Sequence, residues 1–351
     1  MSGTETNETM KAAVFVEPGR MEVREVPKAR LEADTDVVIR VVRTCVCGSD
    51  LWFFRGLTPQ PAGGQTGHES IGVVEEVGAA VTSVKAGDFV VVPFPYSCGQ
   101  CPVCEAGFES VCPHGGYFSA CQAEYLRVPE ADGTVVKVPG VPEDYSDEML
   151  ASLLTISDVM STGYHAAVSA EVKPGCTAVV MGDGAVGLCG VLSAKMLGAK
   201  RIIAMSRHED RAALAREFGA TDIVPERDQA AIDKVLEMTG GYGADAVLEC
   251  VGSKQSFDTA MGLVRRGGVI GRVGLPHGVD VSAEGTFYGN IGIKGGPAPV
   301  RHYDLTGLLD AVVNGDIDPG RVFTKEYTLD DIQSAYEDMD ARRVIKALIR
   351  F

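Results

Sequence analysis

The sequence predicts an α/β protein with two domains, one rich in β-strands and one built on a doubly wound parallel sheet. Two observations predict this fold. Segments rich in β-branched residues, bounded by Gly, Pro or Asp, follow one another from residue 11 to about 150 without regular helices between them. From Cys176, five strand-like segments alternate with four helix-like segments, which is typical of a parallel sheet covered by helices. A chain of 351 residues is also long enough for two domains.

The β-rich part is expected to come from both ends of the chain. We predict strands over residues 11–16, 21–26, 36–43, 70–77 and 88–94. Helical periodicity then covers 147–168. After about Gly296 the pattern becomes less regular, with two helical stretches and a closing strand over 344–351, which we expect to return to the first domain. The expected domains are residues 1–157 with 297–351, and residues 158–296.

The second domain shows the clearer alternation of strands and helices. Its expected strands are residues 177–182, 201–206, 222–225, 245–252 and 268–275. Its expected helices are residues 185–199, 208–220, 228–240 and 254–268. Because each strand is followed by a helix, the strands should run parallel and form one doubly wound sheet.

The composition excludes several classes of function. The net charge of −16 disfavours nucleic acid and anionic membranes as partners, since both need clustered Lys and Arg. No apolar run approaches the ~20 residues of a membrane span. The polar start, residues 1–10, predicts a disordered lead-in without a secretory signal, so a cytoplasmic location is expected. Ten cysteines in such a chain favour metal binding over disulfides.

A glycine-rich loop predicts a dinucleotide site. Gly182, Gly184 and Gly187 form G-x-G-x-x-G, with Ala185 and Val186 between the last two glycines, directly after a predicted strand and at the start of a predicted helix. In that position the first glycine permits a tight turn, the second lets backbone N–H groups approach a pyrophosphate, and the third lets helix and strand pack closely.

The end of the next strand favours NADP(H), with NAD(H) as the alternative. An NAD site usually places Asp or Glu there, about 20 residues after the glycines, to bind the ribose hydroxyls. Here Ser206 and Arg207 occupy this place, and the sequence offers no carboxylate after the strand until Glu209. Arg207 could pair with a 2′-phosphate through charge-assisted hydrogen bonds.

Four cysteines at short spacing predict a structural zinc site, within a lobe of about residues 95–115. The four are Cys98, Cys101, Cys104 and Cys112. Four thiolates with Gly and Pro between them suit a closed tetrahedral site, which has no open position for a substrate. The alternative, a zinc ribbon that binds nucleic acid, is disfavoured by the acidic composition.

A second group of residues suggests a catalytic zinc site. His68 and Glu69 precede a predicted strand, and Cys45 and Cys47, separated by a single residue, lie near the end of another. A catalytic zinc needs three protein ligands and an exchangeable fourth position. His68 with either cysteine could supply two, and the residues alone do not decide between Cys45 and Cys47.

With these motifs in order, the chain resembles the zinc-dependent medium-chain alcohol dehydrogenases over nearly its whole length. The family signature G-H-E-x-x-G-x-x-x-x-x-G-x-x-V stands here as Gly67-His68-Glu69, Gly72, Gly78 and Val81. The resemblance implies a GroES-like catalytic domain from both chain ends and an inserted Rossmann domain. It also implies an enzyme that interconverts small alcohols and aldehydes or ketones, as a homodimer or homotetramer.

The resemblance also implies the zinc ligands. Cys47 directly precedes Gly-Ser-Asp and is then the catalytic cysteine ligand, with His68 second, Asp158 third and Glu69 as a supporting or exchanging fourth ligand. Asp50 is expected to orient His68 by a hydrogen bond. An Asp at position 158 together with Ser206-Arg207 is similar to the NADP-dependent secondary alcohol dehydrogenases, although that branch often lacks the four-cysteine lobe.

The chain departs from the family where protons leave the site. Ser49 matches the family hydroxyl that takes the proton of the alcohol, but the His usually found three residues later is Trp52 here. Tryptophan cannot accept a proton at neutral pH. Trp52, Phe53 and Phe54 would line the substrate cleft or pack in the core.

Three alternative functions stay open at this stage. A polyol dehydrogenase is disfavoured because the stretch around Asp158 lacks the expected Glu-Pro, and a formaldehyde dehydrogenase would be expected to use NAD. A zinc-binding homologue without turnover is kept open by Trp52.

Overall fold

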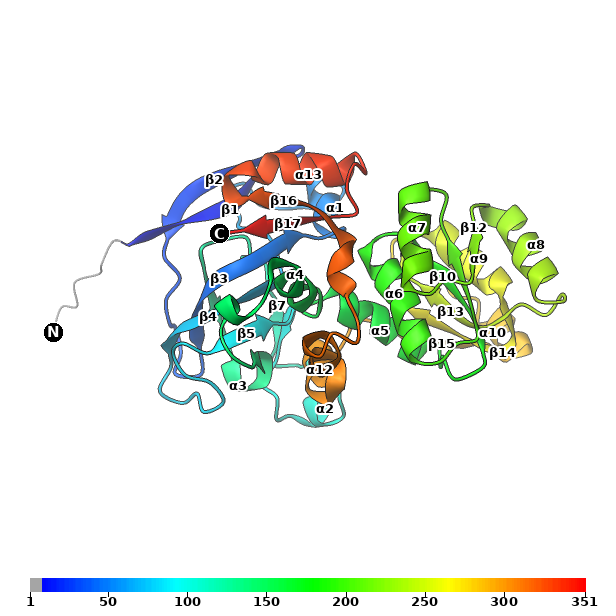
Figure 1. Ribbon diagram of the computed structural model, residues 1–351, viewed down its shortest axis with the longest axis horizontal. Helices are drawn as coiled ribbons and strands as arrows, with labels where there is room; N and C mark the ends of the chain where they lie inside the picture. Colours follow the sequence, from blue (N-terminus) through cyan, green and yellow to red (C-terminus); the bar gives the residue numbers. More distant parts are fainter. Residues whose placement is uncertain (1–7) are drawn as a thin grey trace. The chain divides into compact units, whose positions relative to one another are not determined.

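The protein is described by a computed structural model that covers residues 8–351; most of the polar segment at the start of the chain lies outside the described residues. Contacts divide the chain into two compact units. The first ends at Asp158 and resumes over Pro299–Phe351, and the second is Val159–Ala298. Figure 1 shows strands dominating the first unit and strands alternating with helices in the second.

The first unit is built on a seven-stranded sheet. Its strands are β3 (Val37–Val46), β4 (Ser70–Val77), β5 (Phe89–Val92), β8 (Tyr125–Val128), β9 (Val136–Val138), β16 (Phe323–Thr328) and β17 (Lys346–Arg350). Their order is β16-β17-β3-β4-β5-β9, with β8 also paired to β3. Strand β17, from the end of the chain, is antiparallel to β3 and places Leu348 opposite Cys45. Both chain ends therefore contribute to one sheet.

Two smaller sheets and short helices complete this unit. The sheets pair β1 (Thr9–Glu17) with β2 (Arg20–Pro27), and β6 (Pro95–Tyr96) with β7 (Gly116–Tyr117). The helices are α1 (Asp50–Phe54), α2 (Pro102–Glu105), α3 (Ala131–Thr134), α4 (Asp147–Thr155), α11 (Val300–Tyr303), α12 (Leu309–Val313) and α13 (Ile332–Asp340), and a π-helical turn spans Asp304–Leu308. Four 3₁₀ turns cover Glu109–Val111, Pro142–Asp144, Pro319–Val322 and Leu329–Asp331.

Helix α13 closes one core of the first unit. Its residues Ile332, Ala335, Tyr336 and Met339 recur at helical spacing and are all buried. They pack with side chains of β1, β3, α1 and β17 in one apolar cluster. This packing fixes the start of α1, where residues of the candidate site lie.

The second unit contains a six-stranded sheet in which every described pairing is parallel. Its strands are β10 (Thr177–Met181), β11 (Arg201–Met205), β12 (Asp222–Val224), β13 (Ala244–Glu249), β14 (Val264–Arg272) and β15 (Gly292–Gly295). The order β12-β11-β10-β13-β14-β15 reverses between β10 and β13. This is the Rossmann order, in which a ligand binds beyond the carboxyl ends of the strands at the reversal.

The helices of the second unit are α5 (Val159–Ser169), α6 (Ala185–Met196), α7 (Glu209–Phe218), α8 (Asp228–Met238), α9 (Lys254–Leu263) and α10 (Ala283–Gly289). None of the helices within residues 8–351 has both the length and the apolar character needed to cross a membrane.

Two expectations about individual elements are wrong, and several strands were not expected. The helix expected over 254–268 ends at Leu263, and β14 begins at once, since Val264 favours a strand and the glycines at 267 and 268 disfavour a helix. The helical stretch 147–168 is broken after Thr155 by a turn that contains Asp158. The strands that were not expected are β6, β7, β8, β9, β15 and β16. The sequence of β15 is half glycine and that of β16 is mostly polar, so neither resembles a strand.

Candidate metal centres and cofactor site

The four lobe cysteines converge between β6 and β7. Their sulfur atoms all lie within 4.8 Å of one another. The sulfur of Cys101 is 3.5 Å from that of Cys104 and 3.8 Å from that of Cys112, which is 3.6 Å from the sulfur of Cys98. Zinc–sulfur bonds of about 2.3 Å in a tetrahedron place sulfurs about 3.8 Å apart. All four are free thiols, so the lobe has the donor set and spacing of a closed zinc site.

The backbone of α2 prepares one of these thiols to bind a cation. The N–H of Cys104 lowers the pKa of the Cys101 thiol to about 7, so that the thiolate forms readily. Burial acts in the opposite direction on Cys104 and raises the pKa of its thiol to about 12. A zinc ion would have to displace that proton, as metals do when they bind cysteine.

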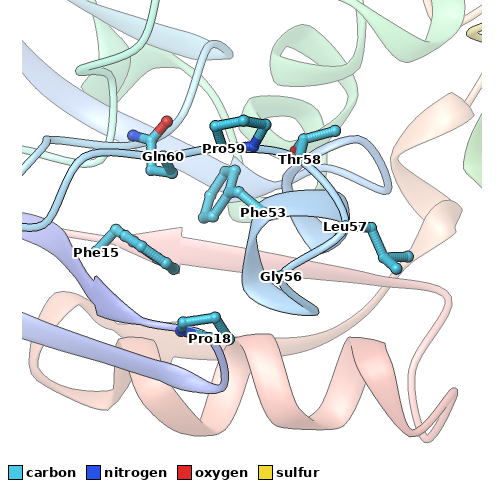
Figure 2. Close-up of a pocket in the computed structure, with 8 residues that line it drawn as sticks. All are labelled: Phe15, Pro18, Phe53, Gly56, Leu57, Thr58, Pro59 and Gln60. Carbon is cyan, nitrogen blue, oxygen red and sulfur yellow. The ribbon is translucent and has the colours of Figure 1, made fainter.

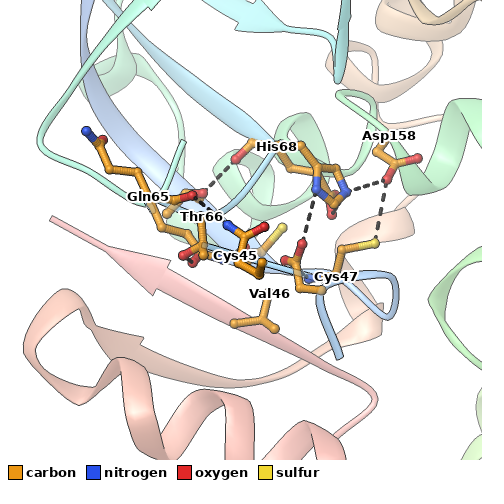
Figure 3. A network of polar contacts seen from close by, with 12 residues as sticks. Cys45, Val46, Cys47, Gln65, Thr66, His68 and Asp158 are labelled. Carbon is orange, nitrogen blue, oxygen red and sulfur yellow. Dashed lines mark hydrogen bonds and ion pairs between the residues drawn. The ribbon is translucent and has the colours of Figure 1, made fainter. Parts of the chain in front are cut away.

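The second cluster brings together Cys47, His68, Glu69 and Asp158, whose candidate ligand atoms also lie within 4.8 Å of one another. Cys47 follows β3, His68 and Glu69 precede β4, and Asp158 lies in the turn after α4 (Figure 3). One carboxylate oxygen of Asp158 is 3.7 Å from the sulfur of Cys47 and 3.4 Å from Nε2 of His68. One sulfur, one nitrogen and one carboxylate oxygen are ligands that zinc accepts. Cys45, the neighbouring cysteine, is not part of this set.

Asp50 connects two members of the second cluster. Its Oδ2 accepts a hydrogen bond of 3.0 Å from the backbone N–H of Cys47, and its Oδ1 lies 3.3 Å from Nδ1 of His68. Burial opposes a charge on His68, but the carboxylate of Asp50 raises the pKa of the imidazole well above its usual value. The contact with Nδ1 leaves Nε2 directed toward Asp158, the orientation that a metal ligand needs.

Lys346 is a residue of this site that sequence reasoning missed. Its Nζ lies 2.7 Å from Oε1 of Glu69, and both side chains are only 1% exposed. Burial raises the pKa of Glu69, and the ammonium group of Lys346 acts against that rise. The other oxygen of Glu69, Oε2, is buried and has no hydrogen-bond partner among the described residues. The sequence does contain a signal for this residue: Lys346 is a charged residue within the apolar closing strand predicted over 344–351.

The residues after Cys47 have separate environments. Ser49 is exposed at the start of α1, and Trp52 is half-buried. Phe53 and Phe54 pack against the ring of Tyr336, with ring centroids 6.0 and 5.2 Å away; Phe54 belongs to the core, and the partly buried Phe53 packs against it. Phe53 also lines a surface pocket of about 380 Å³, shown in Figure 2, which contains none of the candidate zinc ligands.

The glycine-rich loop has the local geometry of a dinucleotide site. Gly182 has a φ of 104°, and a Cβ on Gly187 would lie 1.9 Å from the carbonyl oxygen of Gly182. A Cβ on Gly184 would meet no atom within 4 Å among the described residues. Ala185 and Val186 open α6, whose N-terminus has no side-chain cap, so its backbone N–H groups could bind a pyrophosphate.

The expectation that no carboxylate lies at the end of β11 is wrong. Ser206 is buried and donates a 2.8 Å hydrogen bond from Oγ to Oδ2 of Asp183, a residue of the glycine-rich loop. A carboxylate is therefore present beside Ser206, although the sequence after β11 offers none before Glu209. Arg207 is exposed and makes no ion pair within the described part of the chain.

Known proteins support the resemblance independently. Residues 33–140 match the alcohol dehydrogenase GroES-like domain, and residues 185–312 match the zinc-binding dehydrogenase family. The chain is 36% identical to zinc-type alcohol dehydrogenase B of Aspergillus flavus, over 98% of this chain and 82% of that protein. It is similar in structure to the alcohol dehydrogenase TADH of Thermus sp. ATN1, with a TM-score of 0.88, 31% identity and coverage of 97% and 99% of the two chains.

A further solved structure, a putative zinc-binding dehydrogenase of Sinorhizobium meliloti 1021 bound to NADP, has a TM-score of 0.80 and 25% identity, with coverage of 98% and 100%. The matches extend over both units, with their GroES-like and Rossmann folds. On these grounds the chain belongs to the zinc-dependent medium-chain alcohol dehydrogenase family.

Proposed function

We propose that this protein is an oxidoreductase that interconverts alcohols and aldehydes or ketones by hydride transfer to or from NADP(H). The first unit would be the catalytic domain and the second the cofactor domain. The observation that carries the proposal is the convergence of Cys47, His68 and Asp158 on one point, with their supporting residues in place. Each chain would hold two zinc ions, a catalytic one here and a structural one in the lobe.

The residues of the catalytic cluster would divide the work. Zinc, when bound by Cys47, His68 and Asp158, supplies a Lewis acid that polarises the substrate oxygen. Asp50 orients His68 and the backbone of Cys47. Lys346 forms an ion pair with Oε1 of Glu69. This pair would compete with binding of Glu69 to the metal. Glu69 would then be an exchanging fourth ligand, and the fourth position would stay available to substrate.

The proton of the alcohol would leave through Ser49. Ser49 is an exposed residue two positions after Cys47, and its hydroxyl can both accept and donate a proton. Trp52 offers only an indole N–H donor, so the path from Ser49 must end at water or at another group.

An aromatic wall beside the cluster favours an apolar substrate. The ring of Phe94 lies edge-on to His68, with centroids 6.4 Å apart, and stacks on Tyr117 at 5.9 Å. We therefore infer a preference for apolar or aromatic aldehydes and ketones over polyols.

The first test is turnover of NADPH and NADH with a small panel of aldehydes and ketones. We expect faster turnover with NADPH, because exposed Arg207 can pair with the 2′-phosphate, and the best rates with apolar carbonyls. Preference for NADH would contradict the role of Arg207 and leave the zinc chemistry standing. Absence of turnover with either nucleotide, in protein shown to contain two zinc ions, would instead favour the zinc-binding homologue without catalysis.

The lobe provides a separate prediction. Replacing Cys104 by Ala should remove one of the two zinc ions and lower the midpoint of thermal unfolding, since a structural zinc site contributes folding free energy. The zinc content and unfolding curve of purified protein would test this. Cys176→Ala is the matched control, because Cys176 is also a buried free thiol but lies in the second unit, and it should retain both ions.

The homodimer or homotetramer and the cytoplasmic location stay predictions. Light scattering of the purified chain would decide the number of copies.

A further inference from the structure

The carboxyl ends of β10 and β11 bring three polar side chains together at the place where a Rossmann domain binds the adenosine ribose. Asp183 follows β10, Ser206 follows β11, and Arg211 lies in α7. Two adjacent parallel strands carry the first two residues to the same edge of the sheet. We infer that Asp183 and Arg211 together set the relative affinity for NADP(H) and NAD(H). This inference rests on the proposed function, because it concerns the same nucleotide site.

Asp183 stands where a ribose-binding carboxylate is needed. In NAD enzymes of this fold an Asp or Glu at the end of the second strand accepts hydrogen bonds from the ribose hydroxyls. Here that strand ends in Ser206, whose hydroxyl donates to Oδ2 of Asp183 at 2.8 Å. The side chain of Asp183 therefore points to the end of β11 and away from its own strand. It supplies from the glycine-rich loop the carboxylate that the second strand lacks.

Arg211 compensates the charge of this carboxylate. Its Nη1 lies 3.6 Å from Oδ1 of Asp183 and donates a 3.1 Å hydrogen bond to the backbone oxygen of the same residue. The Arg211 side chain is 10% exposed and that of Asp183 17%, so solvent screens the pair only in part. With the charge of Asp183 balanced, Arg207 can attract a 2′-phosphate that the carboxylate would otherwise repel.

The two charges should act on the two nucleotides in opposite ways. Without Arg211, the unbalanced carboxylate of Asp183 repels the 2′-phosphate of NADPH but can still accept a hydrogen bond from the 2′-hydroxyl of NADH. Without the charge of Asp183, the positive charge of Arg211 is no longer balanced by that carboxylate and attracts the 2′-phosphate more strongly. The ratio of NADPH affinity to NADH affinity should therefore fall in the first case and rise in the second, whichever nucleotide the native chain prefers.

The experiment measures dissociation constants of NADPH and NADH in zinc-loaded protein from the fluorescence of the nicotinamide ring, without substrate. We expect Arg211→Gln to lower the affinity ratio by about fivefold or more, and Asp183→Asn to raise it by a similar factor. Competition with adenosine 2′,5′-bisphosphate and AMP should show the same changes, which would locate the effect at the adenosine end.

The controls use a second ion pair on the same helix. Arg216 and Glu209 lie 3.2 Å apart on α7 with side chains 52% and 86% exposed, so Arg216→Gln removes the same charge from the same element and should leave the ratio within about twofold. Asp183→Asn keeps the size of the side chain and an oxygen that Ser206 can donate to, which protects the fold.

Two results would overturn the inference in distinguishable ways. Native protein that binds both nucleotides, with a ratio that neither variant changes, would overturn the role of Asp183 and Arg211 alone. Native protein that binds neither nucleotide would overturn the proposed function together with this inference.

Discussion

Replacing Lys346 by Met should lower the free energy of unfolding by about 3–5 kcal/mol, because it removes the ammonium group that pairs with a buried carboxylate. Lys346 and Glu69 are each 1% exposed, and their 2.7 Å contact is closer than that of Glu69 with Nε2 of His68, at 4.0 Å. Met has a similar volume, so the loss would come from charge and not from a cavity. Urea unfolding of the zinc-loaded protein, followed by circular dichroism, would measure it.

An exposed ion pair in the same unit gives the matched control. Lys11 and Asp330 lie 3.1 Å apart with side chains 46% and 66% exposed, so solvent screens this pair and Lys11→Met should change the free energy of unfolding far less than Lys346→Met. The double variant Glu69→Gln with Lys346→Met removes both buried charges and should regain most of the stability. Equal losses for Lys346→Met and Lys11→Met would show that the buried pair does not stabilise the fold.

The sequence proposes a set of candidate zinc ligands but shows little of their structural setting. Cys47 and His68 lie in short motifs, whereas Asp158 is 111 residues from Cys47 and was selected only by the resemblance. The helix on which Asp158 was expected is interrupted at that residue. Ser157 donates to the carbonyl oxygen of Leu154 at 2.7 Å, a local side-chain bond of the kind that competes with helix continuation. Periodicity of apolar residues does not detect such a turn.

The two charged residues that were missed act on partners far away in the sequence. Lys346 is 277 residues from Glu69, and only the pairing of β17 with β3 brings it to the site. Asp183 was overlooked for a different reason. The carboxylate beside the end of the second strand belongs to the loop after the first strand, 23 residues earlier, so the residues at the end of the second strand do not indicate it. Sequence motifs indicate sites made of residues close together in the chain, whereas these two contacts depend on strand order and register.

The alternation of strands and helices predicted the parallel sheet well but not its edge. Strand β15 reads Gly-Ile-Lys-Gly and pairs only with β14 among the described strands. Glycine weakens a strand in isolation, so its propensity gave no signal. Its strand conformation comes from the ladder with β14, where Ile293 lies opposite Ile270. Tertiary pairing overrides local preference at this position.

Replacing Cys47 by Ala should abolish most of the turnover, by at least about a hundredfold, because even residues that only support a zinc ligand typically contribute 10–100-fold. The variant should lose the zinc ion of the second cluster and keep that of the lobe, so that zinc content falls from about two ions per chain to one. Metal analysis and turnover of the same preparation would measure both effects.

Cys45 offers a control only two residues away from Cys47. It is also buried, but it lies within β3 and outside the set of converging ligand atoms. Cys45→Ala should therefore keep both zinc ions and turnover within a few-fold of the native rate, at the modest cost in stability of a small buried truncation. If Cys45→Ala lost the ion and Cys47→Ala kept it, the ligand would be assigned to the wrong thiol. If neither variant lost zinc, the second cluster would not bind the metal, and the proposed zinc-dependent reaction would be contradicted.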